Sequence, residues 1–243
     1  MGIFGGTFDP VHDGHLQVAD AVRRQLPMDK VLFIPVSVPL LREEPLADPV
    51  HRLEMVRLAV DGWPGFEADD REIRRAGPSY TVLTLEELRQ DWPTLPLCLI
   101  LGIDTVLRLT EWYRWTELLE LAHIAVMGRP GWRLPAVLPD WWIQARADTA
   151  DDLVKRTAGW VVCVDVPLLD ISSTGVRTEI LQGTVNTEIL PEPVANYIKD
   201  NALYGYHSRS QRFKHRRSQG HGFSCTGGCQ GQRYSTTRCP GSY

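Results

Sequence analysis

Residues 5–15 read Gly5-Gly6-Thr7-Phe8-Asp9-Pro10-Val11-His12-Asp13-Gly14-His15. The stretch joins a short apolar strand expected at residues 1–4 to an amphipathic helix expected over residues 14–25. Glycines let the backbone approach a ligand closely, and a helix N-terminus offers free N–H groups to an anion. Two histidines three residues apart at that N-terminus can both face one phosphate chain. The stretch therefore predicts a phosphate-binding turn, but no P-loop, because no Gly-Lys-Ser/Thr follows.

Downstream of this turn, short apolar runs alternate with amphipathic helical patterns. We expect further strands at residues 31–35, 97–101, 123–127 and 160–164, and helices at residues 49–60, 80–89, 117–121, 172–182 and 192–201. Such alternation is typical of α/β proteins: it predicts a Rossmann-type, doubly wound, mostly parallel sheet with helices on both faces. Residues 128–152 fit neither pattern and are expected to form an insertion or a long loop.

The chain of 243 residues divides by composition into a body, residues 1–205, and a tail, residues 206–243. The tail is rich in Ser, Gly, Arg and Gln with almost no aliphatic residues, so we expect it to be disordered. Its cysteines, Cys225, Cys229 and Cys239, have spacings that fit zinc motifs poorly, and we assign no metal site held by the protein. Cys98 and Cys163, inside apolar runs, are expected to be buried free thiols.

Charge is distributed unevenly between these parts. The tail holds seven Lys and Arg and no acidic residue, which leaves a net charge of −11 for the body. An acidic body argues against a nucleic-acid-binding protein, although RNA binding by the basic tail stays open as an alternative. No apolar run approaches the roughly 18 residues that cross a bilayer, and the N-terminus lacks the features of a signal peptide, so a cytoplasmic location is expected.

The turn resembles the signature of the nucleotidyltransferase superfamily, Gly-x-Phe-x-Pro-x-His-x-Gly-His, which that superfamily pairs with a late Ser/Thr-rich helix start. The late element is present here as Ile171-Ser172-Ser173-Thr174-Gly175-Val176-Arg177. Ser172 is a good N-cap, and an arginine five residues later can reach the phosphates of ATP. The resemblance implies that the catalytic residues are His12, His15 and Arg177.

Over residues 1–205 the chain is similar to bacterial nicotinate-mononucleotide adenylyltransferases. Gly102-Ile103-Asp104 resembles the family's Gly-x-Asp, whose carboxylate contacts a ribose, and Met127-Gly128-Arg129-Pro130 resembles a strand end with an arginine near the adenine or its ribose. The ATP-binding residues implied by the resemblance are Gly5, Gly6, Thr7, Phe8, Gly102, Asp104, Arg129, Ser172, Ser173 and Thr174.

The acceptor side also resembles this family. Residues 72–81 look like the approach to the helix beneath the mononucleotide, and residues 111–115 like the segment whose tryptophan stacks on the pyridine ring. Where the family commonly has Pro-Pro-His followed by Lys or Arg, this chain has Pro39-Leu40-Leu41-Arg42, so Arg42 alone remains as the phosphate contact. The implied mononucleotide-binding residues are Arg42, Tyr80, Thr81, Trp112 and Tyr113.

The resemblance implies a reaction as well as a site. The phosphate of nicotinate mononucleotide would attack the α-phosphorus of ATP in line, forming deamido-NAD and releasing pyrophosphate, as a step of NAD biosynthesis. Mg²⁺ on the triphosphate would help to stabilise the charge, and no protein nucleophile is required. Asp9 is expected to hold the turn rather than act as a base. A homo-oligomer is compatible with this interpretation.

Three alternatives stay open at this point. Pantetheine-phosphate adenylyltransferases share the turn, but their chains are usually shorter and lack the Trp112–Tyr113 segment. A non-catalytic nucleotide sensor would keep the turn without transferring a group, and the intact His12, His15 and Arg177 argue against it. Nicotinamide mononucleotide could replace nicotinate mononucleotide as the acceptor.

Overall fold

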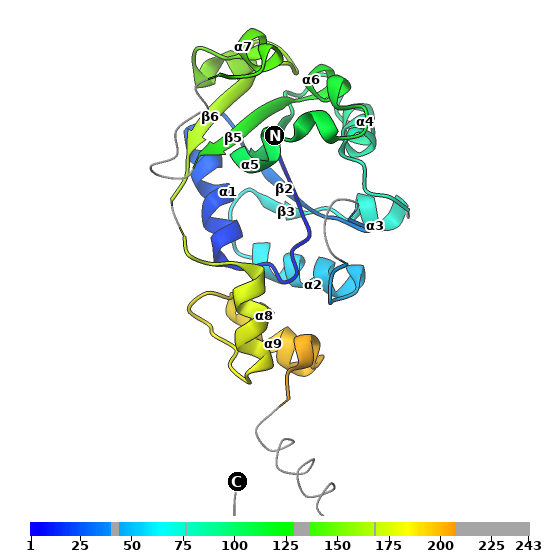
Figure 1. The fold of residues 1–243 in the computed structure, drawn as a ribbon, viewed down its shortest axis with the longest axis vertical. Helices are drawn as coiled ribbons and strands as arrows, with labels where there is room; N and C mark the ends of the chain where they lie inside the picture. The colour runs from blue at the N-terminus through cyan, green and yellow to red at the C-terminus, as the bar shows by residue number, and fades with distance from the viewer. Residues whose placement is uncertain (40–43, 76, 129–136, 168, 208–243) are drawn as a thin grey trace, which may run out of the picture. The chain divides into compact units, whose positions relative to one another are not determined.

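The sheet in the computed structural model has six parallel strands among the described residues, in the order β3-β2-β1-β4-β5-β6 (Figure 1). The strands are β1 (Gly2–Gly6), β2 (Val31–Pro35), β3 (Phe66–Ala68), β4 (Cys98–Gly102), β5 (His123–Gly128) and β6 (Val161–Asp165). The chain starts in the centre, adds β2 and β3 on one side, and then returns to pair β4 with β1. The order reverses between β1 and β4, where sheets of the Rossmann type bind nucleotides. The predicted fold class is confirmed.

The structure describes residues 1–39, 44–75, 77–128, 137–167 and 169–207. Two predicted site residues, Arg42 and Arg129, lie outside these ranges. The tail from residue 208 onward lies outside them too. The roles predicted for Arg42 and Arg129, and the disorder predicted for the tail, therefore stay predictions.

Helices connect the strands and continue after the last one. The α-helices are α1 (Asp13–Gln25), α2 (Pro49–Val60), α3 (Arg71–Arg75), α4 (Thr81–Asp91), α5 (Ile103–Val106), α6 (Leu118–Leu121), α7 (Asp140–Ala145), α8 (Ser173–Leu181) and α9 (Glu192–Asp200). Short 3₁₀ helices occur at η1 (Leu109–Glu111), η2 (Trp115–Glu117), η3 (Ala150–Val154) and η4 (Leu203–Gly205). Figure 1 shows α8 and α9 together beyond the end of the sheet, beside α2.

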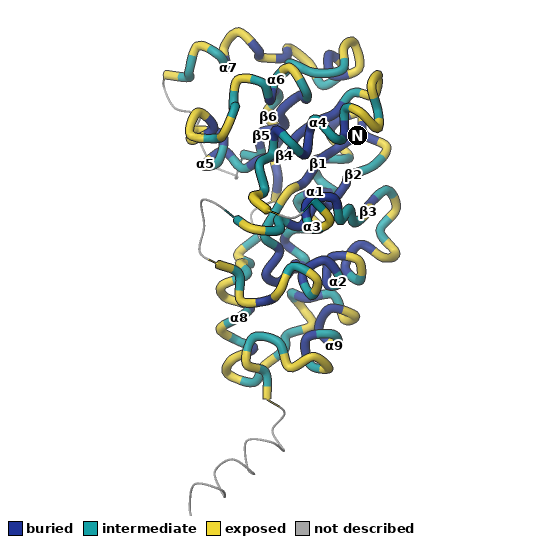
Figure 2. Tube along the Cα trace, turned by 90° about the vertical axis from the view of Figure 1, so that its right-hand side faces the viewer, coloured by how far each residue is buried: buried dark blue, intermediate teal, exposed yellow. Residues whose placement is uncertain are grey.

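The sheet is covered on both faces because successive strand residues point to opposite sides. Phe4 and Phe33 belong to one apolar cluster, which α1, α2, α8 and α9 complete. Ile3 and Leu32 belong to a second cluster, which α4, α5, α6 and α7 complete. Much of the strand trace is accordingly coloured dark blue, as buried, in Figure 2. Two-sided burial explains why the central strands are continuous apolar runs in the sequence.

Some elements depart from the expectations. Strand β3 and helices α3 and α5, of three, five and four residues, were not expected, because segments this short show no periodicity. Residues 128–152 were expected to be irregular, yet α7 lies within them and buries Trp142 to 1% exposure. The prediction that Cys163 is buried is wrong: its thiol is exposed, because β6 is the last strand of the sheet, while Cys98 is buried as expected.

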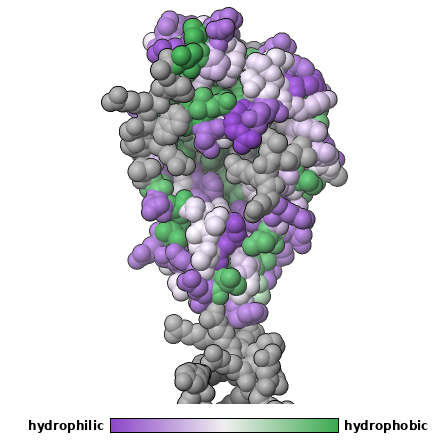
Figure 3. Space-filling view, in the orientation of Figure 1, coloured by the Kyte–Doolittle hydropathy of each residue, from purple (hydrophilic) through white to green (hydrophobic). Residues whose placement is uncertain are grey.

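In the ranges described above, no helix combines the length and the apolar character that crossing a bilayer would need. On the face shown in Figure 3, apolar side chains form small groups between hydrophilic ones.

Candidate active site

The turn after β1 is built around aromatic side chains that fix its path. Phe8 has a left-handed backbone (φ 49°), and its ring is 2% exposed. The ring contacts Phe4 and His15 edge-on, with centroid distances of 5.8 and 5.1 Å. The side chain of Phe8 is therefore part of the core, and only its backbone is placed to meet a ligand.

The two histidines of the turn lie against one another at the start of α1. His12 is the N-cap residue, and its backbone N–H donates to Nδ1 of His15 (3.3 Å). The two rings stack with centroids 3.8 Å apart. Since His15 Nδ1 accepts this hydrogen bond, Nε2 is the ring atom of His15 that can carry and donate a proton. The expectation that both imidazoles face one ligand agrees with this geometry.

Burial determines the charge of His12. Its side chain is 5% exposed, and this desolvation lowers the pKa of His12 to about 4. The ring is neutral at pH 7, so toward an anion it offers an N–H donor and no positive charge.

Gly14 is required by the position of the His12 ring. A Cβ at residue 14 would lie 3.0 Å from Nδ1 and 3.1 Å from Cε1 of His12. A glycine in the first turn of a helix usually lowers helix stability. Here it leaves the space that the first imidazole occupies.

The late helix start meets the turn, although 157 residues separate Ser172 from His15. Ser172 caps α8, with Oγ accepting from the Gly175 N–H (3.1 Å). Nη1 of Arg177 donates to the backbone carbonyl of Asp9 (2.8 Å), and Ser173 Oγ donates to the carbonyl of Pro10 (3.0 Å). The guanidinium therefore lies beside the histidine turn, as the sequence predicts. Thr174 follows in the same turn of α8, and its Oγ1 accepts from Arg177 Nη2 (3.3 Å).

The end of β4 lies beside the turn that follows β1. Gly102 is the last residue of β4, and β4 is the strand next to β1, so residues 102–104 follow the sheet at the point where its order reverses. The exposed carboxylate of Asp104 folds back over Gly102: a Cβ there would lie 2.7 Å from Oδ1. Gly102 and Asp104 thus form one unit at the same edge of the sheet as the turn.

The predicted acceptor residues that the structure describes, Tyr80, Thr81, Trp112 and Tyr113, form a second group. The rings of Tyr80 and Tyr113 are 4.5 Å apart, Tyr113 is 53% exposed, and Trp112 is partly buried against the apolar cluster below. Thr81 is the first residue of α4, so its N–H has no acceptor within the helix. The group offers aromatic surface beside a free helix N-terminus. An isolated bridge between Val38 and Pro78 connects the segment after β2 to this group.

Comparison with known proteins shows the family of the chain. A family model described as cytidylyltransferase-like matches residues 3–179. A probable nicotinate-nucleotide adenylyltransferase of Acidithiobacillus ferrooxidans is 40% identical over 205 residues, which cover 83% of this chain and 94% of that protein. A protein of the same name from Halorhodospira halophila is 42% identical, over 85% of this chain and 95% of its own length.

The chain belongs to the nicotinate-nucleotide adenylyltransferase family. The chain is therefore an enzyme of the nucleotidyltransferase class. Among solved structures, the nicotinic acid mononucleotide adenylyltransferase of Plasmodium falciparum complexed with NaAD superposes with a TM-score of 0.64. That match covers 85% of this chain and 97% of the other at 16% identity, so it supports the fold alone.

Three residues that organise the site were not selected as site residues from the sequence. The buried carboxylate of Asp9 accepts from the N–H groups of Leu46 (2.9 Å) and Ala47 (3.1 Å), and from Tyr204 Oη (2.9 Å). This confirms that Asp9 holds the turn. Burial and the Asp9 carboxylate raise the pKa of Tyr204, which keeps its phenol protonated as the donor. The third residue is Arg52, the only arginine with 0% exposure in the described part of the chain. A tyrosine near the end of the body and an arginine within a helix carry no local signal of such roles.

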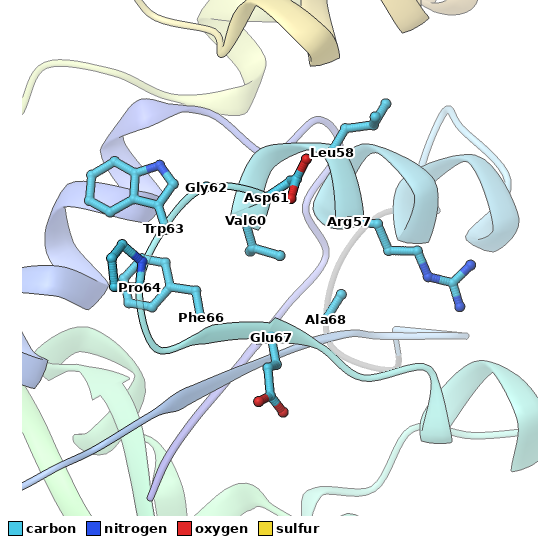
Figure 4. Close-up of a pocket in the computed structure, with 10 residues that line it drawn as sticks. All are labelled: Arg57, Leu58, Val60, Asp61, Gly62, Trp63, Pro64, Phe66, Glu67 and Ala68. Carbon is cyan, nitrogen blue, oxygen red and sulfur yellow. The ribbon is translucent and has the colours of Figure 1, made fainter.

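Other polar features of the structure lie apart from the turn. His123 is fully buried, and its Nδ1 accepts from the Trp160 N–H (3.0 Å), which suits a structural role. A hollow between the end of α2 and β3, lined by Trp63, Pro64 and Phe66, contains none of the predicted site residues (Figure 4). Within the described ranges, no group of three His, Cys, Asp or Glu side chains could hold a metal ion.

Proposed function

We propose that this chain transfers the adenylyl group of ATP to nicotinate mononucleotide, giving deamido-NAD and pyrophosphate. The observation that carries the proposal is the stacked pair His12 and His15 at the N-terminus of α1, with Arg177 fixed beside it. The neutral His12 imidazole, the His15 imidazole stacked on it, a helix N-terminus and a guanidinium would form a site for a triphosphate. The family membership of the chain supports the same reaction.

In the proposed mechanism, ATP lies over Gly5, Gly6 and Thr7, with its phosphates toward the two histidines. A nonbridging oxygen of the mononucleotide phosphate attacks the α-phosphorus. The bond from that phosphorus to the bridging oxygen of the β-phosphate breaks, and pyrophosphate leaves with the electron pair. The attacking phosphate is already ionised at neutral pH, so no general base is required.

The protein contributes alignment and charge stabilisation. His15 donates through Nε2 to an oxygen on which negative charge grows, and Arg177 neutralises the departing pyrophosphate. Mg²⁺ enters with ATP as part of the substrate. Bound to the phosphates, it would supply positive charge against the negative charge that grows on them.

The acceptor is proposed to lie against the second group. The pyridine ring stacks near Trp112 and Tyr113, and the nicotinate carboxylate accepts from backbone N–H groups near Thr81 and Tyr113. A carboxylate gains from the partial positive charge at the start of α4, whereas a neutral carboxamide gains less. This electrostatic difference supports nicotinate over nicotinamide mononucleotide.

The experiment is a pyrophosphate-release assay with ATP and, in parallel, nicotinate mononucleotide, nicotinamide mononucleotide or phosphopantetheine. We expect turnover to be fastest with nicotinate mononucleotide. Faster turnover with another acceptor would reassign the substrate. ATP binding without release of pyrophosphate from any acceptor would show that the chain is a sensor.

A variant of His15 tests the mechanism. His15→Ala should lower kcat by roughly 10²-fold or more, the scale for losing one transition-state donor. Gln17→Ala, on the exposed side of the same helix, is the matched control and should leave kcat unchanged. A near-normal rate for His15→Ala would remove this side chain from the mechanism.

A further inference from the structure

Arg52 joins three segments of backbone in the interior beneath the turn. Its side chain is fully buried. Nη1 donates to the carbonyl of Thr7 (2.7 Å), Nη2 to that of Ser37 (3.1 Å) and Nε to that of Ala47 (3.1 Å). A planar guanidinium holds its nitrogens in fixed relative positions, so it holds the three carbonyls in fixed relative positions too.

Two of these carbonyls belong to different halves of the site. Thr7 is part of the turn assigned to ATP. Ser37 follows β2, and its N–H donates to Ser79 Oγ (2.9 Å). Ser79 immediately precedes Tyr80 of the acceptor group. One side chain therefore connects the ATP turn to the segment that positions the acceptor aromatics.

The third carbonyl belongs to Ala47, whose backbone is held at both of its peptide groups. Ala47 donates its N–H to the Asp9 carboxylate, and its carbonyl accepts from Arg52. Asp9 and Arg52 thus hold the same residue of the segment that leads into α2. The Asp9 charge opposes the effect of burial on the pKa of Arg52, which desolvation lowers, and an arginine remains charged at neutral pH.

We propose that Arg52 is a positioning residue that sets the placement of the two substrates relative to one another. This inference rests on the proposed function. Because the side chain is fully buried, it touches neither substrate and acts through the backbone that it holds, at Thr7 and Ser37 in the two half-sites and at Ala47 between them. Its loss should leave each half-site able to bind its own substrate while the alignment for in-line attack is lost.

The test compares Arg52→Lys with Arg89→Lys. Lysine keeps the charge, but its single ammonium cannot hold three carbonyls in one plane. Arg89 is the matched control, because it also donates to backbone carbonyls, including those of Leu95 (2.8 Å), Leu121 (2.6 Å) and Thr157 (3.2 Å). These residues precede β4, β5 and β6, at the edge of the sheet opposite the site.

We expect Arg52→Lys to lower kcat by about 10- to 100-fold, the scale of a sub-ångström to ångström misplacement of reactants. The KM values for ATP and nicotinate mononucleotide should each stay within about threefold. Both substitutions should lower the thermal midpoint of unfolding to a similar extent. Arg89→Lys, however, should keep kcat near that of the wild type. Equal kcat for the two folded variants, or a rise in one KM alone, would overturn the proposal.

A second variant keeps the test decisive if Arg52→Lys does not fold. Ser79→Ala removes the acceptor of the Ser37 N–H, together with the side-chain hydrogen bond between Ser79 and Glu72. It should lower kcat by about threefold or more, again at unchanged KM values. Wild-type kcat for Ser79→Ala would then overturn the relay from Arg52 to the acceptor group. Turnover of the wild-type chain is measured first: its absence with nicotinate mononucleotide refutes the proposed function, whereas wild-type turnover with unaffected variants refutes only this inference.

Discussion

Replacing Gly14 by alanine should separate activity from stability. The added methyl group would lie 3.0 Å from Nδ1 of His12, whereas ordinary contacts of a Cβ begin near 3.4 Å. The ring must therefore move by about 0.4 Å, the difference between these two distances. It cannot move freely, because it stacks on His15 at a centroid distance of 3.8 Å.

The magnitude follows from this displacement. A misplacement of 1 Å in an active site can cost about 10²-fold in rate, so a shift of less than half that distance should lower kcat by roughly 5- to 10-fold. Stability should change little, because alanine gains up to about 1 kcal/mol of helix propensity over glycine. That gain offsets an overpacking cost of about 1 kcal/mol or more.

The assay is pyrophosphate release with ATP and nicotinate mononucleotide, together with thermal unfolding of Gly14→Ala and the wild type. Gln17→Ala serves as the control, since it changes an exposed position of the same helix without approaching His12. A Gly14→Ala enzyme with wild-type kcat would refute the link between this glycine and the His12 ring. A large loss of stability with the same specific activity per folded molecule would refute it as well.

Three further variants test other parts of the site. For His12, the pKa of about 4 in the folded chain lies below the ordinary 6.5, so the unfolded chain binds the proton first as the pH falls. The wild type should therefore lose about 2 kcal/mol of unfolding free energy between pH 7 and pH 5 relative to His12→Asn, measured by urea titration at both pH values. Tyr204→Phe removes one donor from the buried carboxylate of Asp9 and should lower the free energy of unfolding by about 1–3 kcal/mol in the same titration; no change would show that this hydrogen bond is dispensable. Gly102→Ala must displace the exposed carboxylate of Asp104 and should raise KM for ATP about tenfold, with an unchanged thermal midpoint; an unchanged KM would separate Asp104 from nucleotide binding.

Much of the fold was predictable because it follows from local patterns. The apolar run at residues 31–35 is β2 with the same bounds, and the Pro-initiated amphipathic pattern at residues 49–60 is α2. The order of such segments sufficed to predict the doubly wound sheet. Short elements were missed: β3, with three residues, has too few positions to show an alternation, and α7 lies in a segment where prolines and tryptophans obscure the helical period.

The candidate site was predictable to the extent that its residues are close in the chain. His12, Gly14 and His15 share one turn, so their proximity is a consequence of helix geometry. The contact of Arg177 with the turn could be expected only from resemblance to a family, since no local rule brings α8 to β1. The direct contact with the backbone of Asp9 appears in the folded chain alone.

By itself, the sequence determined the order of strands and helices, the glycine turn after β1 and the positions of its histidines, because hydrophobic periodicity, helix starts and glycine turns are properties of neighbouring residues. Only the tertiary structure decided that Arg52 is buried with its nitrogens on three carbonyls, that Tyr204 donates to Asp9, and that His12 is neutral. These arrangements depend on groups up to 195 residues away in the chain. Desolvation and hydrogen bonding act on whatever lies nearby in space, and in a doubly wound sheet those neighbours are set by the packing of distant elements.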